Sequence, residues 1–190
     1  KAKQVFEELP ARDVVSWSAL IAGYAQQGEF HEAMNCLERM EDEEISPNAA
    51  TYAGILKACA SARAINEGKQ IHIEIIHRSL FQKDIVVGNA LVDMYAKCGL
   101  LTEAHCVLEE LPLRDVVSWS AIISGYAEQE QGHEALNCFE QMQCEGISPN
   151  VVTFICILKA CGSTRDINKG EQIHDEIFSK GLLKKNTVIG

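Results

Sequence analysis

The sequence predicts an all-α protein, a right-handed α-solenoid superhelix built from tandem helix-turn-helix repeats. The chain repeats itself at long range, because RDVVSWSA at residues 12–19 returns at residues 114–121, an offset of 102 residues (114 − 12). Within that period, apolar residues recur at helical spacing in paired segments, and glycine or proline separates the segments. One hairpin cannot cover its own apolar stripe, so stacked neighbours must supply the core, and their concave surface is the default binding site.

The first complete unit, residues 14–48, is expected to hold two amphipathic helices. Their apolar positions are Trp17, Leu20, Ile21 and Tyr24, then Ala33, Cys36, Leu37 and Met40. Gly28 separates the two helices, and Ser46-Pro47-Asn48 ends the second, because proline lacks an N–H and restrains the residue before it. Trp17, and Trp119 in the later copy, lie on the apolar stripe, so we expect both to pack between helices.

Two further units complete the period. Residues 49–84 carry apolar stripes at Tyr52, Ile55, Leu56 and Cys59, then Ile71, Ile75 and Ile76. Residues 85–115 carry Val87, Ala90, Leu91 and Met94, then Ala104, Val107, Leu108 and Leu111, and Pro112 stops the second helix. The cycle restarts with residues 116–150 and 151–186, whereas residues 1–13 and 187–190 are partial units. We therefore expect a fragment of a longer repeat array.

Net charge, apolar runs and cysteine placement limit the partners and the compartment that are expected for this chain. The net charge of −10 argues against broad attraction to phosphate, so any nucleic-acid affinity must come from a local groove. The acidic run Glu41, Asp42, Glu43 and Glu44 is interpreted as a solvated face. No apolar run reaches the roughly 18 residues of a membrane span, and the amino-terminal segment is unlike a signal peptide, so no membrane partner is expected. The eight cysteines lie mostly within helical patterns, which predicts reduced core residues in an intracellular compartment.

The three kinds of unit resemble, in order, the P, L and S motifs of plant pentatricopeptide repeat proteins of the PLS type. The resemblance covers nearly the whole chain and includes ILKAC and QIH in the L-like units and YAKCG in the S-like unit. It implies a single PLS array with motif boundaries 14–48 (P), 49–84 (L), 85–115 (S), 116–150 (P) and 151–186 (L), with a partial S motif at 1–13 and the start of another at 187–190. It also implies binding of single-stranded RNA at one base per repeat.

In that family the fifth and last residues of a motif specify the base, and the second residue flanks it. Carried onto this sequence, the specifying pairs of the P, S and P motifs are Ser18 with Asn48, Asn89 with Asp115, and Ser120 with Asn150. The flanking residues are Val15, Val86 and Val117. The resemblance implies adenine for both Ser/Asn pairs and uracil for the Asn/Asp pair, in a register A, unread, U, A, unread that runs 5′ to 3′ from the amino end.

The L motifs depart from this code, because their pairs are Ala53 with Asp84 and Ile155 with Asn186. An apolar fifth residue cannot hydrogen-bond a base edge, so we expect little base selectivity there. By resemblance, L motifs are also expected to dock small organellar editing-factor proteins. The implied role of the parent protein is target recognition in C-to-U RNA editing in a mitochondrion or chloroplast.

Catalytic motifs find little support in the sequence. His72-Ile73-Glu74 and His174-Asp175-Glu176 fit the H-x-E of zinc deaminases, but no C-x-x-C accompanies them, so both histidines are interpreted as structural. Phosphate-binding and nucleophile-elbow motifs are also missing, and we expect neither enzymatic activity nor a cofactor or metal. A tetratricopeptide-like protein-interaction scaffold remains the alternative, because W-x2-L with a later Tyr suits it, although the glycine expected after that leucine is Ile21 here.

Overall fold

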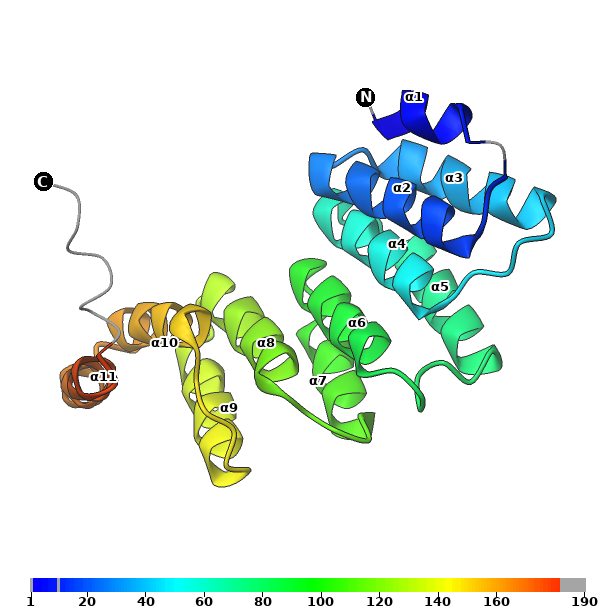
Figure 1. Ribbon diagram of the computed structural model, residues 1–190. Helices are drawn as coiled ribbons and strands as arrows, with labels where there is room; N and C mark the ends of the chain where they lie inside the picture. Colours follow the sequence, from blue (N-terminus) through cyan, green and yellow to red (C-terminus); the bar gives the residue numbers. More distant parts are fainter. Residues whose placement is uncertain (1, 10, 182–190) are drawn as a thin grey trace, which may run out of the picture. The chain divides into compact units, whose positions relative to one another are not determined.

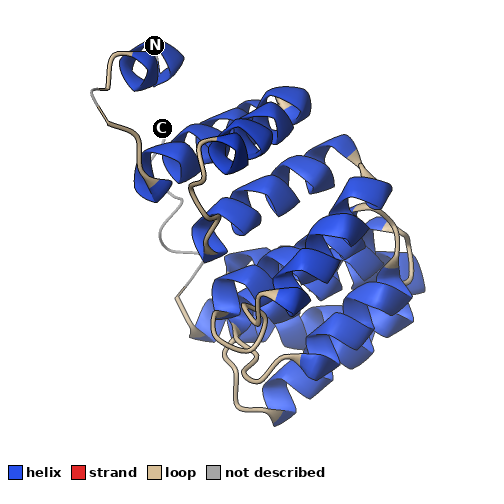
Figure 2. Cartoon of the chain, turned by 90° about the vertical axis from the view of Figure 1, so that its right-hand side faces the viewer, coloured by secondary structure: helices blue, strands red, loops and turns tan. Residues whose placement is uncertain are grey.

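The computed structural model describes residues 2–9 and 11–181, and every regular element in these ranges is an α-helix (Figure 1, Figure 2). The helices are α1 (Ala2–Glu7), α2 (Val14–Gln27), α3 (Phe30–Asp42), α4 (Ala49–Ala62), α5 (Ile65–His77), α6 (Ile85–Lys97), α7 (Leu101–Glu110), α8 (Val116–Glu128), α9 (Gly132–Cys144), α10 (Val151–Thr164) and α11 (Ile167–Ser179). They form two compact units, one ending at Leu113 and one beginning at Arg114.

Three helical hairpins, α2/α3, α4/α5 and α6/α7, make up most of the first unit. Their first helices lie side by side, α2 against α4 and α4 against α6, and each hairpin's second helix packs on its own first helix. The core between them consists of fully buried side chains such as Trp17, Tyr52, Ile55, Leu91 and Met94. Helix α1 covers the exposed end of this stack, because the Phe6 ring lies 4.5 Å from that of Trp17.

The second unit repeats this construction with two hairpins, α8/α9 and α10/α11. Helix α8 lies against α10, and α9 contacts both. Trp119, Ile122, Phe139, Phe154 and Ile157 are buried between them. Each of the two tryptophans is therefore a packing residue, as the sequence predicted.

The first helix of every hairpin begins directly after an Asn or Asp that caps it. The capping residues are Asp13, Asn48, Asp84, Asp115 and Asn150, and in each the side chain accepts a hydrogen bond from a backbone N–H of the first turn. By contrast, the second helices α3, α5, α7 and α9 start without a side-chain cap. The first helix of a hairpin ends at the short turn between its two helices. Gly28, for example, ends α2 in the left-handed conformation with φ 75°.

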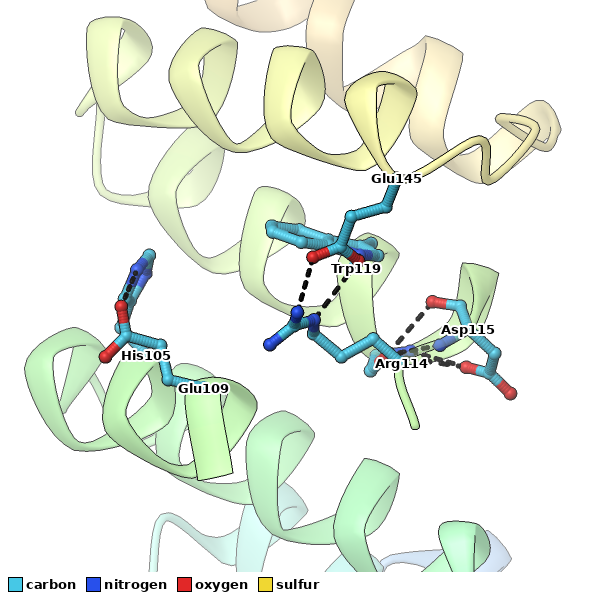
Figure 3. A network of polar contacts seen from close by, with 7 residues as sticks. His105, Glu109, Arg114, Asp115, Trp119 and Glu145 are labelled. Atoms are coloured by element: carbon cyan, nitrogen blue, oxygen red, sulfur yellow. Dashed lines mark hydrogen bonds and ion pairs between the residues drawn. The ribbon is translucent and has the colours of Figure 1, made fainter. Parts of the chain in front are cut away.

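Each P-like unit contains a polar clamp in which one glutamate binds a tryptophan and an arginine, and Figure 3 shows the clamp of the second unit. In the second unit, Glu145 accepts a hydrogen bond from Trp119 Nε1 at 3.0 Å and forms an ion pair with Arg114 at 2.6 Å. Glu43 does the same in the first unit, with Trp17 Nε1 at 3.3 Å and Arg12 at 2.7 Å. Glu43 is exposed, as the sequence predicted for the acidic run, and its carboxylate in addition accepts a hydrogen bond from the buried indole of Trp17.

Some expectations about the core need correction. Ile76 is 53% exposed, because α5 turns Ile71 and Ile75 inward and Ile76 away from the core. Of the cysteines, Cys106 and Cys144 are exposed rather than buried, because both lie on the outer faces of second helices. The buried cysteines are Cys36, Cys59, Cys138 and Cys161. No helix in the described part of the chain is both long and apolar enough to cross a lipid bilayer.

Candidate functional site

The first predicted pair, Ser18 and Asn48, meets at the boundary between two hairpins. Ser18 lies in the second turn of α2, and Asn48 is the N-cap of the neighbouring α4. Their side chains approach to 3.5 Å between Ser18 Oγ and Asn48 Oδ1. The structure thus brings together two residues that are 30 positions apart in the sequence.

Thr51 connects the two members of this pair. Its Oγ1 lies 2.7 Å from Ser18 Oγ and donates to Asn48 Oδ1 at 3.1 Å. It also accepts from the Asn48 backbone N–H at 3.2 Å, which completes a capping box with the Thr51 N–H to Asn48 Oδ1 bond of 3.0 Å. Ser18 Oγ donates to the carbonyl of Val14 at 2.6 Å, so the hydroxyl lies in a closed local network.

The second predicted adenine pair, Ser120 and Asn150, has the same arrangement in the other compact unit. Ser120 Oγ lies 2.7 Å from Thr153 Oγ1. Thr153 Oγ1 donates to Asn150 Oδ1 at 3.1 Å, and the Thr153 N–H donates to the same oxygen at 2.9 Å. Two separate units therefore reproduce one network at the predicted positions.

Capping fixes which atom of each asparagine remains for a ligand. Oδ1 of Asn48 and of Asn150 is occupied by the N–H and hydroxyl of the threonine in the first turn. No described residue accepts a hydrogen bond from Nδ2 of either side chain, so each amide retains its N–H donors. A flipped amide would set Nδ2 against a backbone N–H, two donors face to face, which disfavours that orientation.

The predicted uracil pair is divided between the two units. Asn89 lies on α6 in the first unit and is only 8% exposed. Asp115 caps α8 in the second unit, and its Oδ1 accepts from the backbone N–H of Val117 at 2.8 Å and of Ser118 at 3.0 Å. An aspartate cap differs from an asparagine cap in its second side-chain atom, which is an acceptor oxygen rather than a donor nitrogen.

The L-motif pairs lack this arrangement. Ala53 has no polar side-chain atom, and Asp84 caps α6 by accepting from the Val86 N–H at 2.9 Å. Ile155 is 62% exposed on α10. Its predicted partner, Asn186, lies outside the described residues.

The predicted flanking valines are exposed although they are apolar. Val15, Val86 and Val117 are 68%, 53% and 53% exposed, each in the first turn of the first helix of its hairpin. Val152, at the same place in the second L motif, is 54% exposed. These valines provide an exposed apolar surface next to Asp13, Asp84, Asp115 and Asn150, on which a flat ring can rest, whereas Asn48 is followed by two alanines.

Sequence reasoning missed the two threonines, which are fully buried and belong to neither specifying position. A signal for them exists, because a hydroxyl residue three positions after an Asn or Asp is the pattern of a reciprocal cap. The same reciprocal cap also joins Asp13 to Ser16, whose N–H to Oδ1 bond lowers the pKa of Asp13.

The two histidines of the H-x-E sequences lie in different surroundings. Nδ1 of His72 lies 2.9 Å from the Tyr95 hydroxyl, and burial lowers the pKa of His72. His174 is exposed on α11. Within residues 2–9 and 11–181, no group of three or more His, Cys, Asp or Glu side chains is placed to hold a metal ion.

Comparison with known proteins identifies the fold and the family. The profile of the PPR repeat family matches residues 12–61 and 114–163, and the related PPR repeat profile matches residues 89–116, which together exceed half of the chain. Among solved structures, PPR10 in complex with an 18-nt psaJ RNA element superposes with a TM-score of 0.77 at 20% identity, over 90% of this chain and 26% of PPR10. The nuclear protein-only RNase P 2 of Arabidopsis thaliana superposes with a TM-score of 0.64 at 13% identity, over 86% of this chain and 38% of that protein. These likenesses confirm the all-α helical-repeat solenoid.

Relatives found by sequence have a higher identity to this chain than these solved structures do. The chloroplastic pentatricopeptide repeat-containing protein CRR2 of Arabidopsis thaliana is 40% identical over 185 residues, which are 96% of this chain and 28% of CRR2. A putative mitochondrial pentatricopeptide repeat-containing protein of the same plant is 40% identical over 181 residues, 95% of this chain and 29% of its own length. The chain thus spans a little over a quarter of the length of these two relatives. With both repeat profiles matched at the hairpins described above, the chain belongs to the pentatricopeptide repeat family.

Proposed function

We propose that this chain binds single-stranded RNA and reads one base per repeat, as part of the target-recognition array of a plant organellar C-to-U editing factor. The observation that carries the proposal is the recurrence of one Ser–Thr–Asn network, at the predicted specifying positions, in two separate compact units. Organellar location is supported by relatives whose names specify a chloroplast or a mitochondrion. RNA as the ligand is supported by the fold shared with PPR10, which was solved with RNA bound.

The hydrogen-bonding chemistry of the pairs suits the bases assigned to them. Adenine presents an acceptor, N1, beside an amino donor, N6, on its Watson–Crick edge. Asn48 Nδ2 is a donor for N1, and a lone pair of Ser18 Oγ can accept from N6, while Val15 supplies an apolar surface for the ring. At Asp115 the carboxylate is an acceptor, which suits the N3–H of uracil. Guanine opposite Ser18 and Asn48 would place like groups together at both contacts.

The motif assignment is part of the same proposal. The P, L and S boundaries at residues 14, 49, 85, 116 and 151 coincide with the first residues of α2, α4, α6, α8 and α10. The helix starts support the subdivision, and the capping residue of each helix is the last residue of the preceding motif. In both P motifs, a threonine joins the asparagine that caps the next helix to the fifth-position serine of the preceding hairpin's first helix.

The test is binding of this chain to short RNAs carrying 5′-A-N-U-A-N-3′, measured by fluorescence anisotropy at low and moderate salt. Each of the three assigned bases is exchanged in turn, and the two unread positions serve as controls. We expect each assigned exchange to cost about tenfold or more in affinity, since a good base contact is worth roughly 1–3 kcal/mol. Equal affinity for all exchanged RNAs contradicts base reading.

A protein-interaction scaffold is the second candidate, and the net charge of −10 favours it, because phosphate is not attracted over a broad surface. Helix α10 in the second L motif also presents exposed apolar side chains at Val151, Val152, Ile155 and Leu158. We propose that this L-motif surface docks a small editing-factor protein. The proposal is supported if the wild-type chain captures such a protein in a pull-down and the Ile155→Asp variant does not. Equal capture by both chains contradicts it.

A further inference from the structure

The buried threonines Thr51 and Thr153 stand between the two members of each Ser/Asn pair. Each hydroxyl lies 2.7 Å from the serine Oγ and 3.1 Å from the asparagine Oδ1. Each also accepts from the backbone N–H of the asparagine at 3.2 Å. Neither threonine is exposed, so neither can touch a ligand.

The chain contains a natural comparison for this network. The two fifth-position serines, Ser18 and Ser120, are each followed in the next motif by a third-position threonine that contacts them. The first L motif has Ala53 in the fifth position, and the next motif carries Val87 in the third. A third-position hydroxyl thus follows both fifth-position serines and is absent after Ala53, whereas Ser118, which follows the fifth-position Asn89, serves the capping box of Asp115.

The threonine hydroxyl is a second partner that helps to orient the serine hydroxyl, because each hydroxyl has a single proton. In one arrangement Ser18 donates to the Val14 carbonyl and Thr51 donates to Ser18. In the other, Ser18 donates to Thr51, and Thr51 donates to Asn48. Both arrangements direct the serine proton into the protein, so the serine offers a lone pair to a base.

We propose that Thr51 and Thr153 are positioning residues for base specificity, which hold Ser18 and Ser120 as hydrogen-bond acceptors beside the donor amides of Asn48 and Asn150. This inference rests on the proposed RNA function. An acceptor next to a donor matches adenine, whose amino group donates and whose N1 accepts. Guanine reverses both groups, so the threonines enforce the preference for adenine over guanine.

The test uses the near-isosteric changes Thr51→Val and Thr153→Val, with Thr51→Ser as the conservative variant that keeps the hydroxyl. Affinity is measured for RNAs with adenine or guanine at the first or the fourth base, opposite the first and second P motifs. We expect Thr51→Val to lower the adenine-over-guanine ratio at the first base by about fivefold, the worth of one net hydrogen bond. The ratio at the fourth base stays unchanged, and Thr51→Ser retains the wild-type ratio at both.

Thr153→Val gives the reciprocal result in the other compact unit, with loss at the fourth base alone. Thermal melts of each variant identify any general loss of structure, because Thr51 also completes the cap of α4. A purely structural role would lower affinity for every RNA equally and leave both ratios intact, and that outcome overturns the inference. A wild-type chain without any base preference would instead remove the proposed function itself.

Discussion

Replacing Glu145 with alanine is expected to destabilise the second unit by about 1–4 kcal/mol. The carboxylate accepts from the indole of Trp119 at 3.0 Å, and Trp119 is only 3% exposed. Leaving that buried N–H without a partner costs about 1–3 kcal/mol. The ion pair with Arg114, whose side chain is 31% exposed, contributes up to about 1 kcal/mol more.

Urea unfolding measures this loss, followed by circular dichroism and by tryptophan fluorescence. Glu145→Gln is a graded variant, because its amide oxygen still accepts from the indole while the charge is lost. Glu140→Ala is the matched control, since its ion pair with Lys169 has a carboxylate side chain that is 57% exposed and should contribute less than about 0.5 kcal/mol. If Glu145→Ala shifts the unfolding free energy no more than Glu140→Ala, the clamp is not a stabilising contact.

Three further predictions use other features of the helices. Gly132→Ala should destabilise α9 by about 1–3 kcal/mol, because the new Cβ would lie 2.9 Å from the Ala160 carbonyl oxygen. Gly162→Ala is the matched comparison: open space surrounds this glycine, so alanine should raise the melting temperature by lowering the entropy of the unfolded state. Burial lowers the pKa of His72, so the unfolded state binds this proton at a higher pH than the folded state does. The free energy of unfolding should therefore fall as the pH drops below about 6.5. In urea unfolding at a series of pH values, His72→Gln should weaken this pH dependence. Alkylation of the native chain followed by peptide mapping should label Cys106 and Cys144 first, and equal labelling of the buried thiols would contradict the described packing.

Much of the architecture could be predicted from the sequence, because its signals are local and repeated. The apolar stripe through Trp17, Leu20 and Ile21 identifies the buried face of α2. Gly28 marks the end of that helix through a conformation that glycine adopts without steric cost. These signals depend on neighbours within one or two turns, and they recur at a fixed offset.

The polar contacts were harder to anticipate, because they join residues about thirty positions apart. The bond from Trp17 to Glu43 requires knowing how the end of α3 lies over α2. The contact from Ser18 to Thr51 requires knowing that α4 lies beside α2 in the same register. Ile76 was instead predicted to be buried and is exposed, because helical spacing alone could not distinguish it from its buried neighbour Ile75.

The most direct test of base reading is a change of Asn150 to aspartate, with affinities measured for all four bases at the fourth RNA position. Aspartate caps a helix as well as asparagine does, so the melting temperature should stay close to that of the wild type. The outward atom changes from a donor to an acceptor, and we predict that adenine loses affinity while uracil and guanine gain relative to it, with the first position unaffected. An unchanged preference for adenine at the fourth position would contradict the assignment of Asn150 to base recognition.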